Sequence, residues 1–151
     1  MKEKRASRPK FTREASRLAR SSSLGSLEKI MKRLLAPGGC PWDRRQTHAS
    51  LLKYLREESG EVSRAVRKKD WANLQEELGD VLLQVVFHSA LARRDGRFGL
   101  ADVIRTINAK MVRRHPHVFA GGKLSTPAQV LRQWKVIKKA EKARARRAAK
   151  A

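Results

Sequence analysis

The sequence predicts an all-α fold. Apolar residues recur at a spacing close to 3.6 in every periodic segment, which is the period of an α-helix. No segment gives a strong strand signal, and Gly, Pro or a capping residue separates each periodic segment from the next. A chain of 151 residues suits one domain with a modest core. We therefore expect a bundle of four or five helices.

Five helices are expected, and local signals place their ends. Ser, Thr and Asp accept hydrogen bonds from first-turn amides, and Pro is favoured at the first helical position. The expected first helix follows Ser26 and stops at Pro37, the second runs from Thr47 to about residue 68, the third covers 71–94, the fourth covers 100–114, and the fifth begins at Thr126-Pro127.

The positive charge is concentrated at the two ends of the chain. The net charge is +22, of which residues 1–23 carry +6 and residues 135–151 carry +7. Such ends are typical of solvated tails that contact polyanions such as nucleic acid non-specifically. We expect a disordered basic tail over 1–23, a folded domain over 24–138 and a second basic tail over 139–151.

Cysteine usage and hydropathy indicate the cellular compartment and the surfaces that the protein buries. Cys40 is the single cysteine and has no internal partner, which favours a reducing compartment, and we expect the cytoplasm. No apolar run reaches the ~18 residues of a membrane span, so no membrane association is expected. The stretch 78–91 is apolar nearly all round, more than one small domain buries. It predicts a helix-lined subunit interface.

Carboxylates on two expected helices predict a metal site. Glu58 and Glu61 are three residues apart, as are Glu77 and Asp80, so each pair lies on one helical face. The short turn between these helices makes them antiparallel neighbours, which brings the pairs together. Four close carboxylates repel, and a hard cation such as Mg²⁺ relieves the repulsion and binds substrate phosphates. The alternative is a set of solvated acids paired with the many basic residues.

Other metal sites have weaker support. A di-iron bundle needs Glu-x-x-His twice, and no histidine lies three residues after a glutamate. His115 and His117 lack the Cys or further His partners that zinc requires. Oxygen ligands and a hard cation remain the favoured interpretation.

An ordered series of motifs covers about half of the chain. It comprises 39–48 (GCPWDRRQTH), Glu57-Glu58-x-x-Glu61, Glu77-x-x-Asp80, 82–88, Asp95–Phe98 and 113–119. In this order and spacing the chain resembles the MazG family. The resemblance implies an all-α NTP pyrophosphatase fold that dimerises through helix packing. It also implies hydrolysis of nucleoside triphosphates between the α- and β-phosphates.

The resemblance implies a role for each matching residue. The metal ligands would be Glu58, Glu61, Glu77 and Asp80, with Mg²⁺ as the ion and Mn²⁺ as its substitute. Among the glutamates, Glu57 or Glu58 would orient or deprotonate the attacking water, and Glu61 would be essential for activity. The family's substrate-binding residues match Asn108, Lys110, Arg114, Trp134 and Lys138. Two further candidates rest on residue type alone: Trp42, an aromatic in a Gly/Pro loop that could stack on a base, and Arg113, which could contact phosphate.

Several alternatives stay open. Trp134 also suits a core position, Lys138 the basic tail, Trp42 a structural loop, and Arg113 a plain surface charge. The substrate could be narrower, as in dUTP, dCTP or phosphoribosyl-ATP pyrophosphohydrolases. The charge also suits a nucleic-acid-binding module, and a scaffold without turnover is the remaining alternative. Some MazG proteins carry two tandem copies of this unit, and the sequence shows one.

Overall fold

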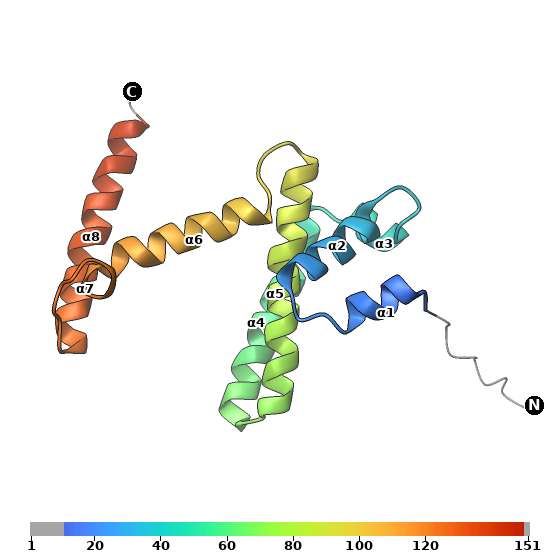
Figure 1. Ribbon diagram of the computed structural model, residues 1–151, viewed down its shortest axis with the longest axis horizontal. Helices are drawn as coiled ribbons and strands as arrows, with labels where there is room; N and C mark the ends of the chain where they lie inside the picture. The colour runs from blue at the N-terminus through green and yellow to red at the C-terminus, as the bar shows by residue number, and fades with distance from the viewer. Residues whose placement is uncertain (1–10, 150–151) are drawn as a thin grey trace, which may run out of the picture. The chain divides into compact units, whose positions relative to one another are not determined.

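The structure, a computed structural model, describes residues 11–149 (Figure 1). Within this range every regular element is an α-helix, which confirms the predicted all-α class. The five expected helices are α2 (Leu24–Leu35), α4 (His48–Lys68), α5 (Trp71–Arg94), α6 (Leu100–Arg114) and α8 (Pro127–Ala148). Three short helices add to them: α1 (Arg13–Ala19), α3 (Pro41–Arg45) and α7 (Pro116–Phe119). No helix in the described range is long and apolar enough to cross a membrane.

The helix caps follow the predicted local chemistry with one exception. The side chains of Thr47, Asp70 and Thr126 each accept a hydrogen bond from an amide in the first turn of the helix that follows. For α2 the cap is Ser23 rather than Ser26, because Ser23 accepts from the Ser26 amide at 3.1 Å. The helix therefore begins earlier than the sequence predicted.

Both predicted tails contain helix within the described residues, and the disorder predicted over 1–23 does not hold for α1. Helix α1 lies within 1–23, where Thr12 caps it through the Ala15 amide at 3.2 Å. Helix α8 continues ten residues beyond the predicted boundary at 138. Ala, Lys and Arg are strong helix formers, which explains why a charged run extends an existing helix. The remaining tail residues, 1–10 and 150–151, lie outside the described range.

The chain divides into two compact units between Leu100 and Ala101. The centre of the first unit is an antiparallel hairpin of α4 and α5, which run side by side in Figure 1. Two residues connect the helices. Lys69 adopts a left-handed conformation with φ 56°, and the Asp70 amide donates to the Ala65 carbonyl at 3.0 Å. This C-cap satisfies the end of α4 and turns the chain directly into α5.

All buried apolar side chains of the described range belong to the first unit. They come from α2, α4, α5 and the first residue of α6: Met31, Leu51, Ala65, Val86, Phe87, Leu91, Ala92 and Leu100. Leu91 and Ala92 are fully enclosed. The described residues from Ala101 onward contribute no buried apolar side chain, so the second unit depends on contacts of another kind.

The loop after α2 requires glycine at one position. A Cβ atom on Gly39 would lie 2.2 Å from the Leu34 carbonyl oxygen, far inside van der Waals contact. The Cys40 amide donates to that same oxygen at 2.8 Å. The chain thus folds back tightly on the end of α2, and this reversal leads into α3 and Trp42.

A histidine pair joins α4 to α5. The Nδ1 atoms of His48 and His88 lie 2.7 Å apart, and the rings are stacked with centroids 5.0 Å apart. Burial lowers the pKa of His88, and the proximity of His48 lowers it further. One Nδ1 atom therefore carries a proton that the other accepts, and protonation of both rings would place two positive charges in contact.

We predict that this pair makes stability depend on pH. The pKa of His88 is lowered on folding, so between that value and about 6.5 the unfolded chain binds more protons than the folded one. The free energy of unfolding is therefore not reduced by His88 above about pH 6.5, and it falls as the pH decreases below that value. Urea unfolding at pH 7.5 and 5.5 measures the loss, and His88→Gln should show less of it than the wild type.

The matched control is His117→Gln, which removes a histidine hydrogen-bonded to Gln133 in the second unit. It should lose as much stability on acidification as the wild type. An unchanged loss in His88→Gln would contradict the assignment to His88.

Candidate functional site

The hairpin brings carboxylates from two helices together. Helix α4 supplies Glu58 and α5 supplies Glu77 and Asp80. One carboxylate oxygen from each of the three lies within 4.8 Å of the others. We call these three residues the acidic group. Its spacing suits several oxygen ligands on one cation, and it lies where the helical period and the short turn predicted it.

Glu61 and Glu57, the other acids of the predicted site, lie beside the acidic group. The Glu61 side chain hydrogen-bonds with Glu77 and also forms an ion pair with Arg64, one turn further along α4. Glu57 is exposed, and its charge acts on Glu58. The structure therefore gathers three of the four predicted ligands in one group, with the fourth already holding a cationic partner.

Burial and mutual repulsion make the acidic group unfavourable when it is fully ionised. Glu77 is only 8% exposed, and burial raises its pKa, followed by the charge of Glu61 and a hydrogen bond to that residue. Burial also raises the pKa of Glu58, with added repulsion from Asp80 and Glu61. A bound divalent cation would remove this repulsion and favour the charged form.

An aromatic pair lies on the same helical face as the acidic group. Trp42 of α3 packs edge-to-face on Tyr54 of α4, with ring centroids 5.7 Å apart. Tyr54 precedes Glu58 by four residues, which is one helical turn. Half of the Trp42 surface is exposed, so its ring is open to a ligand. Tyr54 was not among the predicted site residues, because a lone tyrosine in a helix carries no sequence signal of this contact.

In the second unit, one carboxylate joins two predicted phosphate-binding arginines. Glu141 of α8 accepts a hydrogen bond from Arg113 Nε at 2.7 Å and two from Arg114, through Nε at 3.2 Å and Nη2 at 2.7 Å. The hydrogen bonds from Arg114, then those from Arg113, lower the pKa of Glu141 to about 2. Sequence reasoning missed Glu141, although it lies seven residues after Trp134 on the same helical face.

Trp134 and Lys138 lie next to this ion pair on α8. The Trp134 ring meets His115 edge-on with centroids 5.2 Å apart, and Lys138 Nζ lies 5.7 Å from the centre of the same ring. Trp134 Nε1 is buried without a hydrogen-bond partner. The half-buried tryptophan therefore packs inside its own unit and still has an unused donor.

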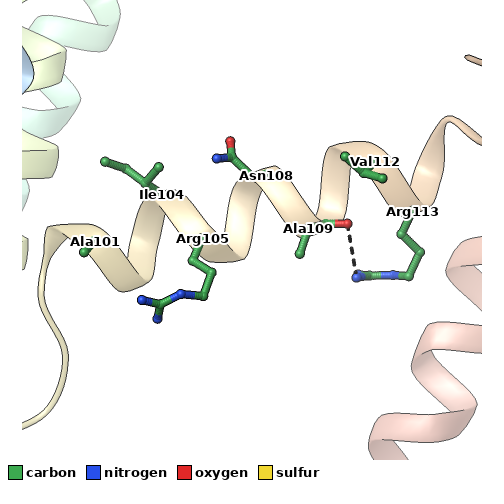
Figure 2. Close-up of a pocket in the computed structure, with 7 residues that line it drawn as sticks. All are labelled: Ala101, Ile104, Arg105, Asn108, Ala109, Val112 and Arg113. Carbon is green, nitrogen blue, oxygen red and sulfur yellow. Dashed lines mark hydrogen bonds between the residues drawn. The ribbon is translucent and has the colours of Figure 1, made fainter. Parts of the chain in front are cut away.

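Asn108 and Arg113 border a shallow groove along α6, whereas Lys110 does not line it. Figure 2 shows the lining, which this helix alone supplies, and the bond from Arg113 Nη1 to the Ala109 carbonyl at 3.4 Å. The groove has a volume of about 750 Å³. A second cavity of about 650 Å³, between α2 and α5, includes none of the predicted site residues.

Comparison with known families identifies one matching domain. Residues 46–119 match the MazG nucleotide pyrophosphohydrolase domain. This range contains the acidic group, Asn108, Lys110 and both arginines. It ends before α8, so Glu141, Trp134 and Lys138 lie outside the matched residues.

Curated relatives extend the similarity beyond that range. Nucleoside triphosphate pyrophosphohydrolase/pyrophosphatase MazG of Thermotoga maritima is 52% identical over 77% of this chain and 44% of its own length. Nucleoside triphosphate pyrophosphohydrolase of Escherichia coli K12 is 43% identical over 81% of this chain and 47% of its own. The chain thus spans less than half of either relative.

A solved structure matches the fold. The crystal structure of a mazG-related protein from Thermotoga maritima aligns with a TM-score of 0.66 and 35% sequence identity. The alignment covers 77% of this chain and 99% of that one. The likeness therefore includes almost the whole of the solved chain.

We predict that Glu77→Gln separates metal binding from folding. Removing one charge from the acidic group relieves repulsion, so without metal the variant should unfold at the same temperature as the wild type or above it. Mg²⁺ or Mn²⁺ should raise the midpoint of the wild type, because a ligand that binds only the folded state stabilises it, and should have little effect on the variant. Thermal unfolding with metal and with chelator measures both.

Glu76→Gln is the matched control, since Glu76 is an exposed neighbour outside the acidic group. Its midpoint should respond to metal as the wild type does. An equal metal response in Glu77→Gln would contradict the ligand assignment.

Proposed function

Because the chain belongs to the MazG nucleotide pyrophosphohydrolase family, we propose that it hydrolyses nucleoside triphosphates to the monophosphate and pyrophosphate. Water attacks the α-phosphorus, the bond to the bridging oxygen breaks, and pyrophosphate leaves. The observation that carries the proposal is the acidic group on α4 and α5, a set of hard oxygen donors. Phosphate transfer needs such a set, because the reacting groups carry negative charge.

The donor set fits Mg²⁺, with Mn²⁺ as the substitute. Carboxylate oxygens are the protein ligands that Mg²⁺ prefers, and substrate phosphates complete its coordination. Glu58, Glu77 and Asp80 would hold the ion, and Glu61 would join them by exchanging its ion pair with Arg64. When bound, the ion neutralises phosphate charge and orients the reacting groups. Glu57, exposed beside the acidic group, would orient the attacking water or accept its proton.

The basic and aromatic residues would bind the rest of the substrate. Lys110, Arg113 and Arg114 would contact phosphates and stabilise the charge that grows on pyrophosphate as it leaves. Trp42, exposed and backed by Tyr54, would stack on the base. The remaining predicted contacts are those of Asn108, Trp134 and Lys138.

A specific preference for dUTP, dCTP or phosphoribosyl-ATP would leave this chemistry unchanged. The same acidic group and cations would serve each of these substrates. Contact with nucleic acid would be a separate, non-specific property of the basic end of α8, and it would weaken steeply with salt.

We propose that a second copy of the chain covers an apolar face of α5. Leu78, Leu82 and Val85 recur at spacings of four and three residues, and their exposed fractions are 52%, 42% and 38%. Such a row on a helix that already packs against α4 is typical of a subunit interface. The proposal agrees with the helix-lined interface that the sequence predicted.

We predict that Leu82→Lys shifts the protein toward the monomer. A buried lysine at a helix–helix interface loses hydration without gaining a partner. Analytical ultracentrifugation should show a lower mass for Leu82→Lys, whereas Val136→Lys, at a more exposed apolar position on α8, should leave the mass unchanged. A wild type that sediments as a monomer would contradict the proposed interface.

Turnover itself is tested with a panel of ribo- and deoxynucleoside triphosphates, with Mg²⁺ and with chelator. We expect metal-dependent release of pyrophosphate and monophosphate. Glu61→Gln should reduce kcat/KM at least tenfold, about the effect of removing even an outer partner of a metal site. Glu14→Gln, which removes the exposed partner of Arg33, is the charge-matched control.

Release of orthophosphate in place of pyrophosphate would show that a different bond is broken. Full activity and unchanged metal affinity in Glu61→Gln would contradict its role as a ligand.

A further inference from the structure

We propose that Glu141 is a positioning residue, which fixes the guanidinium groups of Arg113 and Arg114 in place for the phosphates of the substrate. This inference rests on the proposed function. Its first support is the shared geometry: Oε1 of Glu141 accepts from Arg113 and Oε2 accepts twice from Arg114. One carboxylate therefore holds two consecutive arginines at the end of α6.

The ion pair leaves donors available to a ligand. A guanidinium has five N–H donors. Arg113 directs one at Glu141 and one at the Ala109 carbonyl, and Arg114 directs two at Glu141. About three donors remain on each side chain by this count. The exposed fractions of the two side chains are 48% for Arg113 and 26% for Arg114, so both groups still reach solvent.

The local charge remains positive after the carboxylate is included. Glu141 offsets one of the two arginine charges, and Lys138 lies one turn before it on α8. After Asp102 the sequence contains no acid other than Glu141, although it contains twelve lysines and arginines besides Arg113 and Arg114. The single carboxylate of this region thus contacts the two consecutive arginines at the end of α6, although basic residues of α8 are its neighbours in the sequence.

Stability alone is a poor explanation of this contact. Ion pairs that water still reaches contribute little to stability, because the side chains lose freedom and water screens the charges, and all three of these side chains retain some exposure. Ordering two long arginines before the substrate arrives has a different benefit. It removes that entropic cost from binding and from the reaction, where a misplaced cation stabilises the leaving group poorly.

The opposite role for Glu141 makes a different prediction. A carboxylate on two arginines could compete with phosphate for the same donors. Its removal would then strengthen binding of anions. Positioning requires that its removal weakens binding, so the direction of the change distinguishes the two roles.

The experiment compares the wild type with Glu141→Gln and Glu141→Asp, with Glu14→Gln as the control for loss of one carboxylate from an arginine ion pair. KM for a nucleoside triphosphate and the inhibition constant of inorganic pyrophosphate are measured with Mg²⁺. Neither constant depends on the fraction of correctly folded enzyme, so a variant that merely contains less folded protein would show unchanged values of both.

We expect Glu141→Gln to raise both constants about tenfold, the size expected when a charged hydrogen-bonding partner is removed. Glu141→Asp, which keeps the charge, should recover part of the loss, and Glu14→Gln should match the wild type. Unchanged or lower constants in Glu141→Gln would overturn the proposal.

Direct binding of inorganic pyrophosphate, measured by calorimetry in enough salt to suppress contacts of the basic ends, separates this inference from the proposed function. If the wild type hydrolyses no nucleotide, the proposed function fails. Glu141 then keeps its assigned role only if the wild type binds pyrophosphate more tightly than Glu141→Gln, and equal binding rejects it.

Discussion

The two-residue connection between α4 and α5 is the constraint on which the acidic group depends. Lys69 in its left-handed conformation and the Asp70 cap leave no freely moving residue between the helices, so the register of one helix against the other is fixed. One residue more or less would rotate α5 by about 100° relative to its present face. Glu77 and Asp80 would then point away from Glu58. The turn, far from the acids along both helices, therefore sets their geometry.

Different interactions stabilise the two units: apolar packing in the first, and hydrogen bonds with ring contacts in the second. The first contains every buried apolar side chain of the described range, and its hairpin is closed by packing and by the His48–His88 pair. The second has hydrogen bonds and ring contacts in place of a core, with Glu141 on two arginines and Trp134 against His115. Polar contacts of this kind depend on direction, so they fix side-chain positions even where they add little stability.

Features with a local cause could be predicted from the sequence. The caps at Thr47, Asp70 and Thr126 depend on residues within one turn, and the acidic group required only the helical period and a short turn. The contact of Glu141 with Arg114 could not be predicted. It joins residues 27 positions apart across an irregular segment that carries no period.

The predicted tails show a second reason for failure. Positive charge predicts a solvated tail, yet a run of Lys, Arg and Ala also favours helix, and α8 begins at a strong capping box. The same charge concealed Glu141, because one acid among many basic residues looks like part of a solvated surface. Only its spacing from Trp134 and Lys138, on one face of α8, could have indicated a role.

The acids of the described range fall into two sets, those that pair with arginine and those that do not. With 36 basic and 14 acidic residues, an acid placed at random has a basic neighbour within reach. Six acids of the described range do form ion pairs with arginine: Glu14, Glu28, Glu61, Asp95, Asp102 and Glu141.

The other seven acids within residues 11–149 have no such ion pair: Asp43, Glu57, Glu58, Asp70, Glu76, Glu77 and Asp80. Of these, Glu58, Glu77 and Asp80 cluster together, where their charges and that of Glu61 repel one another. Burial and repulsion raise the pKa of Glu77, whereas two arginines lower that of Glu141 to about 2. The carboxylate of Glu141 is thus already neutralised by arginine, whereas that of Glu77 has no cationic partner. In a chain so rich in lysine and arginine, three acids that cluster together without a basic partner are best explained by a cation that the protein does not itself supply.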